Sequence, residues 1–413
     1  MRDVVSAPPG SERAKKIRSI IVRTMTTLIM LALFFLIMAG GTPFVVMLVL
    51  VCQALVYREV TALFELTAQS GGRPIEGKGA EKSEDRWSKT LNWYFFAVTN
   101  YFLYGESLIH YFKHVVFADA WLTPFATNHR FISFMLYMIG FVGFVSNLKR
   151  QYLRQQFGLF CWVHMTLFLI VVSSHFIVNN ILEGLIWFWV PACLVICNDI
   201  FAYVWGMSFG RTPLIQLSPK KTVEGFVGAF FTTLVFAYIL GTFSMRFNYM
   251  ICPGHDLGVT AWDNVECEKN PVFIWRDLPI GEPLVTILSA WARRPVTSIP
   301  VAPFQFHSVV LAAFASLVAP FGGFFASGFK RAFDIKDFGD SIPGHGGMTD
   351  RMDCQFLMGM FTYVYYSTLI RVNHVTPGSI LQIVVSSLGP QEQIELYREL
   401  TSYLHGRGLL GSV

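Results

Sequence analysis

Long apolar runs constrain the fold of this chain more than any other feature of its sequence. A helix that crosses a bilayer needs about 20 mostly apolar residues, and such runs recur along the chain. Only 14% of the residues are charged, whereas a soluble domain carries roughly a quarter. We therefore predict an all-α polytopic membrane protein with about nine transmembrane helices, placed at 20–39, 42–57, 92–112, 130–147, 157–178, 182–204, 223–245, 305–328 and 354–371.

Basic residues are spread unevenly over the loops between these helices. The tail up to Arg23 carries six Lys/Arg, loop 58–91 carries six and loop 329–353 carries four, whereas 113–129 carries one and 179–181 none. Loops rich in Lys and Arg stay in the cytoplasm, so the N-terminus and the loop 329–353 are predicted to lie there. The formal charge of +5 is mild and favours lipid headgroups or phosphates as partners over nucleic acid.

Composition also divides the chain into parts. Segment 58–91 is rich in Gly and charges, which is typical of a flexible linker, and segment 246–304 is polar. The residues after Arg371 predict an amphipathic segment with a helix from about Pro390. The predicted organisation is a cytoplasmic basic tail (1–19), N-terminal transmembrane helices with the cytoplasmic linker 58–91 (20–178), a catalytic transmembrane domain with a small lumenal insert at 246–304 (182–371) and an amphipathic C-terminal tail (372–413).

Seven cysteines are scattered along the chain, with no Cys-x-x-Cys pair. Four of them that lie in apolar runs are predicted to be inert packing residues. Cys252 and Cys267 lie together in the polar segment 246–304. These two can pair if that segment faces an oxidising lumen.

One carboxylate stands at the end of an apolar run. Asp199 has no basic neighbour in sequence before Arg211, and Tyr203 follows one helical turn later. A carboxylate at membrane depth is costly and is usually functional. The alternative is an Asp that is satisfied by packing at a helix end. We take Asp199 as a candidate site residue.

A pair of lysines occurs in the next loop, in the stretch "SPKKTVEG". Ser218 and Pro219 are predicted to start a helix, whose free N–H groups attract phosphate. Lys220 and Lys221 would stand at that start. The alternative is a solvated lysine pair of the kind that the positive-inside rule produces. Glu224 favours a functional role, because a merely basic patch does not need an acid facing the next span.

The densest charge cluster of the chain is "GFKRAFDIKDFGDSIPGHGGMTDRMD", from Gly328 to Asp353. It holds four Lys/Arg, five Asp and five Gly between two apolar runs. Lys330 and Arg331 end a predicted helix, where snorkelling is the alternative to a functional role. The stretch "PGHGG" predicts a tight loop, because glycine lets the backbone approach a ligand closely. His345 lies inside these glycines and is therefore no core histidine.

The residues after this loop predict a helix with acidic residues in its first turn. Thr349 is predicted to cap that helix, and Asp350 and Asp353 then lie on one face, three residues apart. Two carboxylates beside basic residues suit a Mg²⁺ ion that bridges to phosphate oxygens. Together with the lysine pair, this cluster predicts a site that handles several phosphates beside a membrane, as phosphoryl or nucleotidyl transfer requires.

From Ser327 to Asp353 the sequence resembles the signature of phosphatidate cytidylyltransferases, also called CDP-diacylglycerol synthases. The match runs from the Ser and the Lys-Arg pair through Lys-Asp and Pro-x-His-Gly-Gly to Asp-Arg-x-Asp. The stretches "SPKKTVEGFVGA" and "NDIFAYVWG" resemble the same family, so the resemblance covers the second half of the chain. The first five predicted spans resemble the family only in being hydrophobic.

This resemblance implies that CTP and phosphatidic acid react, with Mg²⁺, to give CDP-diacylglycerol and pyrophosphate. It implies an endoplasmic reticulum membrane enzyme with a cytoplasmic active site that feeds phosphatidylinositol and related phospholipid synthesis. The resemblance and the residue chemistry together assign catalysis to Lys220, Lys221, Lys330, Arg331, Asp337, His345, Asp350 and Arg351, substrate binding to Ser218, Thr222, Lys336, Gly346, Gly347 and Tyr203, and metal binding to Asp350, Asp353, Asp337, Asp199 and Glu224.

The sequence departs from the bacterial members of this family in one place. Those members carry a Gly-Asp pair and a Glu just before the signature Ser, where this chain reads "PFGGFFAS". A carboxylate expected near Gly323 is therefore missing, and the sequence resembles the eukaryotic branch. Asp199, Asp337 or Glu224 is left to fill the second metal position.

Two other functions compete with this interpretation. A CDP-alcohol phosphotransferase-like enzyme requires DGxxAR…GxxxDxxxD, and "DIFAYVWGMSFG" lacks the Gly, the Arg and the later Asp pair. A membrane transporter predicts ionisable residues in the middle of several spans and repeat symmetry, whereas these charges gather at one rim and no repeat is visible. The sequence leaves open the acyl preference, the number of metal ions, the residues that recognise cytosine, the side of the C-terminal tail and the oligomeric state, a homodimer included.

Overall fold

The computed structural model describes residues 9–70, 78–111, 123–215, 218, 221–254, 258–279, 281–282, 285, 289–290, 295, 297–342, 346–372, 380–381, 384–385 and 388–408. The chain divides into two units, Met1–Ser367 and Thr368–Val413, and each is described by itself. In chain order the elements are α1 (Pro9–Gly40), α2 (Thr42–Ser70), α3 (Lys78–Tyr111), α5 (Thr123–Thr127), α6 (His129–Ser146), α7 (Leu153–Leu167), the π-helical turn η1 (Phe168–Val172), α8 (Ser173–Glu183), α9 (Ile186–Phe209), α10 (Val223–Ser244), α11 (Asn248–Ile251), the 3₁₀ turn η2 (Pro271–Phe273), β1 (Arg276–Pro279), β2 (Ser298–Val301), α13 (Pro303–Leu317), α14 (Pro320–Ala332), α15 (Thr349–Leu369) and α17 (Pro390–Gly406).

The prediction of an all-α polytopic membrane protein is confirmed. Each of the predicted spans overlaps a helix of the structure. The count of nine is not confirmed, because α1 has only a shorter apolar part, Thr24–Gly40, and α3 and α15 carry polar residues along their length. Among the described residues, six helices are long and apolar enough to cross a membrane, namely Thr42–Leu63, His129–Ser146, Leu153–Glu183, Ile186–Phe209, Val223–Ser244 and Pro303–Ala332.

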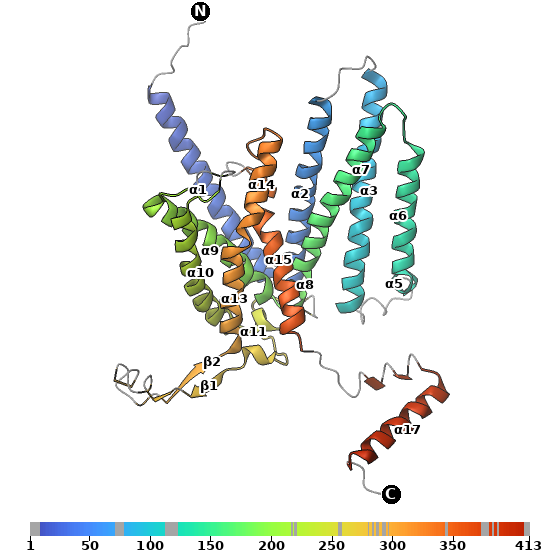
Figure 1. The fold of residues 1–413 in the computed structure, drawn as a ribbon, viewed down its shortest axis with the longest axis vertical. Coiled ribbons are helices and arrows are strands. Elements are labelled where there is room, and N and C mark those ends of the chain that lie inside the picture. The colour runs from blue at the N-terminus through green and yellow to red at the C-terminus, as the bar shows by residue number, and fades with distance from the viewer. Residues whose placement is uncertain are drawn as a thin grey trace, which may run out of the picture. The chain divides into compact units, whose positions relative to one another are not determined.

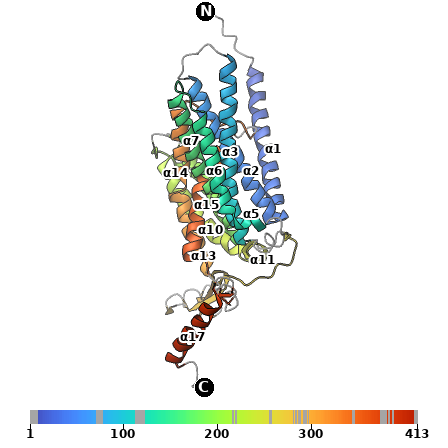
Figure 2. The same ribbon diagram turned by 90° about the vertical axis from the view of Figure 1, so that its right-hand side faces the viewer.

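The first unit is a bundle in which two groups of helices are joined by a shared core. In one group α10 packs against α9 and α13, and in the other α3 packs against α6 (Figure 1). α1 and α2 are in contact and run side by side (Figure 2). Gly225 permits the close approach of α10 to α9, because a Cβ there would lie 2.6 Å from the Ala202 carbonyl oxygen. Buried apolar side chains of α1, α2, α8 and α15 form a core that includes Val45, Ile177 and Phe356.

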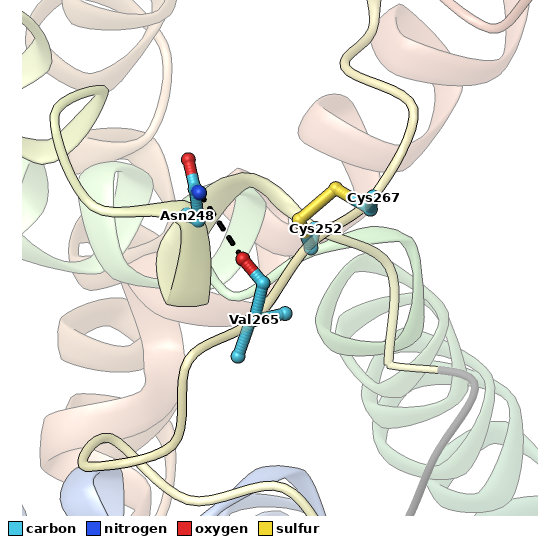
Figure 3. Close-up of a disulfide and its surroundings, with 4 residues drawn as sticks. All are labelled: Asn248, Cys252, Val265 and Cys267. Atoms are coloured by element: carbon cyan, nitrogen blue, oxygen red, sulfur yellow. Dashed lines mark hydrogen bonds between the residues drawn. A yellow bond between two sulfur atoms is a disulfide. The ribbon is translucent and has the colours of Figure 1, made fainter.

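The bundle has two different ends (Figure 1). Residues 333–342 and 346–348, between α14 and α15, lie at one end, and we call it the loop end. α11 and the antiparallel hairpin of β1 and β2 lie at the other end, and we call it the disulfide end. There Cys252 and Cys267 are joined with a Cα–Cα distance of 5.9 Å, and the Asn248 side chain donates to the Val265 carbonyl oxygen at 3.1 Å (Figure 3). The pairing that the sequence made conditional is therefore formed.

The predicted flexible linker 58–91 is helical over most of its length. α2 continues to Ser70 and α3 begins at Lys78, so a linker of that length is a wrong prediction, and 71–77 lie outside the described residues. The segment after 57 is rich in Leu, Ala and Glu, which favour helix more strongly than its few breakers oppose it. The predicted span 42–57 is therefore too short at its C-terminal end.

The second unit contains α17, which begins at Pro390 as the sequence predicts. Its acidic residue in the first turn, Glu392, accepts a hydrogen bond from the Gly389 N–H at 2.8 Å. The side chains of Ile394, Tyr397 and Leu400 are exposed. This helix therefore has apolar side chains that no other described part of its unit covers.

Candidate functional site

Segments that are far apart in the sequence meet in a cleft of about 380 Å³ at the loop end. Ser218 of the lysine-pair loop lies opposite the end of α14 and the residues that follow it. Both stretches that the sequence analysis singled out therefore contribute to one cleft. It is lined by Ser218, Ser327, Lys330, Arg331, Asp334, Ile335 and Lys336.

The end of α14 supplies the positive charge of this cleft. Lys330 and Arg331 lie in the last helical turn, where cations are stabilised by the helix dipole. The helix is closed by a hydrogen bond from the Ile335 N–H to the Lys330 carbonyl oxygen at 3.0 Å. Asp334 takes up a left-handed conformation, with φ of 52°, which Asp tolerates better than most residues. This turn directs the chain back over α14.

Asp350 organises the loop between α14 and α15. Its Oδ1 receives the Lys330 ammonium at 2.6 Å, and its Oδ2 accepts the N–H groups of Phe338 at 3.1 Å and Gly347 at 3.3 Å. The Asp350 side chain is only 10% exposed. The carboxylate therefore anchors the loop and partly neutralises Lys330, while its role as a metal ligand stays a prediction.

A second group of charges lies near the N-terminus of α14, around Gly323. A Cβ at Gly323 would lie 3.5 Å from Asp353 Oδ2 and 3.7 Å from Lys221 Nζ. The Lys221 ammonium also lies 4.6 Å from the centre of the Phe324 ring. The absence of a side chain at Gly323 therefore leaves the space into which Asp353 and Lys221 extend.

Asp199 belongs to this group as well. Its carboxylate interacts electrostatically with Lys221 and Arg351. It also acts on the charge of Asp353. Asp199 and Asp353 are thus two carboxylates from different helices, α9 and α15, that interact electrostatically with each other and with Lys221.

This pair is suited to a magnesium ion. Mg²⁺ is usually held by one or two carboxylates together with substrate phosphates, and two carboxylates are what α9 and α15 bring together. In the part of the chain that the structure describes, no three His, Cys, Asp or Glu side chains form a metal-binding group. The five predicted metal ligands are therefore not gathered in one place.

The other predicted ligands lie elsewhere. Asp337 is exposed and lies beside Gly346, where a Cβ would be 3.3 Å from its Oδ1. Glu224 accepts hydrogen bonds from the Arg211 N–H at 3.1 Å and the Thr212 hydroxyl at 2.7 Å. Glu224 thus fastens the segment before α10 to the start of that helix.

The predicted helix start at Ser218 is wrong. α10 begins at Val223, and Thr222 is its N-cap residue, accepting from the Gly225 N–H at 3.2 Å. Before α10, the Leu214 N–H donates to the Lys221 carbonyl oxygen at 2.8 Å, and the Val223 N–H donates to the Thr212 carbonyl oxygen at 3.0 Å. Threonine is a preferred N-cap residue, so Thr222, which was predicted to bind substrate, has a structural function in this position.

The glycines of the signature have conformational functions. Gly346 has a φ of 81°, a conformation that glycine adopts without strain, and the Ile342 N–H donates to its carbonyl oxygen at 3.0 Å. Gly347 is enclosed, because a Cβ there would lie 2.8 Å from Glu59 Oε2. Thr349 was predicted to cap α15, but its hydroxyl donates to Glu59 Oε2 at 2.7 Å instead.

Other predicted residues do not line the cleft or are not described. Tyr203 is 69% exposed on α9. Arg351 is exposed on α15, and its charge acts on Asp199. Lys220 and His345 lie outside the described residues.

The sequence analysis missed Glu59. This residue lies in the C-terminal half of α2 and is 5% exposed, and it contacts the signature segment 282 to 290 residues further along the chain. Its position in the stretch interpreted as a flexible linker hid it. Glu59 is, like Asp199, an acid at the end of an apolar run. Arg58 precedes it directly, so it did not stand out as a charge without a basic neighbour.

Comparisons with known proteins extend the resemblance beyond the second half of the chain. A family model described as "Cytidylyltransferase family" matches residues 21–369. A protein of Schizosaccharomyces pombe named putative phosphatidate cytidylyltransferase is 46% identical over 394 residues, which are 95% of this chain and 86% of that protein. Phosphatidate cytidylyltransferase of Saccharomyces cerevisiae is 42% identical over 95% of this chain and 82% of its own. Phosphatidate cytidylyltransferase 1 of Homo sapiens is 41% identical over 99% of this chain and 87% of its own.

Proposed function

Because the chain belongs to the cytidylyltransferase family, we propose that it transfers the cytidylyl group of CTP to phosphatidic acid, giving CDP-diacylglycerol and pyrophosphate. The relatives that carry the name phosphatidate cytidylyltransferase align with nearly its whole length. The enzymes of this class join two anionic substrates, of which one is a lipid. The loop end of the bundle offers the charges that such a reaction needs.

One observation carries this proposal, namely that the basic cleft and the carboxylate pair lie along one face of α14. Gly323, Ser327 and Arg331 recur every fourth residue, which aligns them on a single helix face. Arg331 and Ser327 line the cleft, and Gly323 adjoins Asp353 and Lys221. At a rise of about 1.5 Å per residue, the two groups lie roughly 12 Å apart along the helix.

The reaction requires neutralisation of the phosphate charges more than it requires a general base. A phosphomonoester is largely dianionic at neutral pH because its second pKa is about 6, so the lipid phosphate oxygen is a ready nucleophile. It forms a bond to the α-phosphorus of CTP, while the bond from that phosphorus to the bridging oxygen of the β-phosphate breaks. Pyrophosphate leaves with the electron pair, and no proton has to move.

We assign the basic residues of the cleft to the phosphates of CTP. Arg331 and Lys336 are exposed and line the cleft together with Lys330. Lys221 lies at the carboxylate pair, which suits it to the charge that develops between the two reacting phosphates. Arginine and lysine at fixed positions lower the repulsion between the two anions without having to reorganise.

A magnesium ion is part of this proposal. Asp199 and Asp353 would hold it, and when bound it would neutralise phosphate charge and orient the reacting oxygens. Asp350 and Asp337 stay predicted ligands from the loop side. The carboxylate pair supports this assignment, because Mg²⁺ is usually bound by one or two carboxylates together with substrate phosphates. Lys221 beside the pair can bind the same phosphates.

We also propose that the site faces the cytoplasm of an endoplasmic reticulum membrane, where the product feeds phosphatidylinositol and related phospholipid synthesis. The excess of Lys and Arg in the loops at the loop end supports this orientation. The disulfide at the opposite end supports it as well, because disulfides persist in oxidising compartments such as the lumen.

The experiment that tests the proposed function follows both products. Purified full-length protein in detergent is incubated with CTP labelled in the cytosine, phosphatidic acid and Mg²⁺, and labelled lipid and pyrophosphate are measured. We expect both products in equal amounts, and neither when CTP, phosphatidic acid or Mg²⁺ is left out. Pyrophosphate without labelled lipid would indicate hydrolysis, and no product from folded protein would contradict the proposal.

A further inference from the structure

A buried carboxylate of α2 holds the segment that leads into α15. Glu59 is 5% exposed, and its Oε1 accepts hydrogen bonds from the Ser341 hydroxyl and from the Met348 N–H at 2.9 Å. Its Oε2 accepts from the Thr349 N–H at 2.9 Å and from the Thr349 hydroxyl at 2.7 Å. Both oxygens of one side chain are thus occupied by donors from a segment that is far away in sequence.

These donors are the ones that the start of a helix leaves without partners. The first N–H groups of α15 have no carbonyl oxygen of their own helix to bind, and Met348 and Thr349 donate theirs to Glu59. A negative charge at a helix N-terminus is also favourable for the helix dipole. Glu59 therefore caps α15 from another helix, in the place where the sequence predicted Thr349 to do so.

The segment fits closely around this carboxylate. A Cβ at Gly339 would lie 3.1 Å from Glu59 Oε1, and a Cβ at Gly347 would lie 2.8 Å from Oε2. One turn further along α2, Leu63 packs with Ala326 of α14 and Phe338 of the loop. α2 thus supports the loop with a polar contact and an apolar contact on the same face.

Glu59 and Asp350 bind different residues of the loop. Asp350 binds Phe338, Gly347 and Lys330, while Glu59 binds the residues on either side of Gly347. Lys330, one of the basic residues that line the cleft, is therefore connected to α2 through two carboxylates and the short segment that they share. A substitution of Glu59 therefore removes hydrogen bonds that hold the loop and the first turn of α15. We expect it to shift Asp350 and Asp353, and through Asp350 also Lys330.

We propose that Glu59 is a positioning residue of the active site, through which the N-terminal helices set the geometry of the signature loop. The proposal rests on the proposed function where it refers to activity, and the contact itself can be tested without activity. In this proposal Glu59 contacts neither substrate and acts by fixing the loop and the first turn of α15. The N-terminal helices are accordingly part of the catalytic unit and not only a membrane anchor.

The kinetic test compares Glu59→Gln with a matched variant, Thr61→Ala, in the purified full-length chain. Thr61 is also buried in α2, but its hydroxyl donates to the Tyr57 carbonyl oxygen of its own helix. In Glu59→Gln an amide NH₂ faces groups that are themselves donors, so we expect kcat/KM for CTP to fall by about tenfold or more. Thr61→Ala should stay within about twofold of the wild type. Glu59→Asp keeps the charge and should recover part of the loss.

A second measurement reads the contact directly, by amide hydrogen exchange without substrates. In Glu59→Gln the peptide that covers 346–352 should exchange faster by about tenfold or more, while peptides from α9 and α10 exchange as in the wild type. Faster exchange throughout the bundle would mean a general structural role and would overturn the proposal, as would unchanged exchange at 346–352. Ser341→Ala removes one donor from the loop side and gives a milder form of the same effect if Glu59→Gln does not fold.

The two measurements separate the proposals. If the wild-type protein forms no CDP-diacylglycerol, the proposed function fails, and the exchange comparison still decides whether Glu59 holds the loop. If the wild type is active and Glu59→Gln keeps full kcat/KM, the positioning role is wrong while the function stands.

Discussion

At the scale of single residues, two adjacent glycines beside the carboxylate pair have different functions. Gly322 and Gly323 are neighbours in α14, yet their surroundings differ. A Cβ at Gly322 would collide with the Asp353 backbone carbonyl oxygen, whereas one at Gly323 would meet its nearest neighbour, Cys354 Sγ, at 3.4 Å. Gly322 thus lets α14 approach α15, and Gly323 leaves space for side chains of the site.

This difference predicts opposite effects for the same substitution. Gly322→Ala should destabilise the protein by about 1–3 kcal/mol, because a backbone carbonyl cannot move aside as a side chain does. Gly323→Ala should leave the stability unchanged or raise it by up to about 1 kcal/mol, because alanine favours helix. Thermal unfolding of both variants in the same detergent checks this. Equal melting temperatures for the two variants would contradict the described contact between α14 and α15.

The individual site residues were only partly predictable from sequence. Lys330, Arg331, Lys336 and Ser218 were predicted and line one cleft. Glu224 was singled out for its acidity, but its carboxylate binds the backbone before α10, a contact between close residues that pattern alone does not distinguish from metal binding. Glu59 was missed because hydrogen bonds across 290 residues leave no local pattern.

At the scale of elements, the start of α10 decides where the lysine pair stands. The sequence predicted the helix to begin at Ser218, since Ser-Pro is a common helix start. The structure begins it at Val223 with Thr222 as the cap, because the Lys221 carbonyl oxygen accepts a hydrogen bond from the Leu214 N–H, which competes with helix there. Lys221 therefore extends from a loop toward Asp353 and is not part of a helix.

This arrangement predicts that Thr222 matters through its hydroxyl. Thr222→Ala removes the acceptor for the Gly225 N–H and should cost about 1 kcal/mol, seen as a lower midpoint of thermal unfolding. Thr222→Ser keeps the acceptor and should retain most of the stability. A loss in both variants would show that the methyl group, which packs near Gly210, matters instead of the cap.

At the scale of the whole molecule, the proposed site and the disulfide lie at opposite ends of the first unit. The disulfide segment is fastened to the bundle by the Tyr249 hydroxyl, which donates to the Met38 carbonyl oxygen at 2.6 Å, and by the Gly254 N–H, which donates to the Leu182 carbonyl oxygen at 2.8 Å. The class of the fold was predictable because apolar runs of spanning length admit little else. The lengths of α2 and α3 were not predictable from sequence, because both helices continue past their apolar part into sequence that is polar on average.

This separation predicts that the disulfide contributes to stability and not to catalysis. Replacing Cys252 and Cys267 together by Ser should lower the free energy of unfolding by about 2–4 kcal/mol, the usual range for a bridge of this kind. Because the cleft lies at the other end, kcat/KM should stay within about twofold of the wild type when assayed well below the melting temperature. A large loss of activity in folded protein would contradict the separation of the two ends.

The measurement that tests the central claim most directly is the formation of CDP-diacylglycerol over a range of Mg²⁺ concentrations, for the wild type, Asp353→Asn and Asp340→Asn. Asp340 is an exposed carboxylate of the same loop and serves as the control. We predict that the wild type and Asp340→Asn need CTP, phosphatidic acid and Mg²⁺ alike. Asp353→Asn should lose activity by about a hundredfold or more, or need far more Mg²⁺, because one of the two paired carboxylates is gone. Full activity of Asp353→Asn at the same Mg²⁺ concentration would contradict the account of the site.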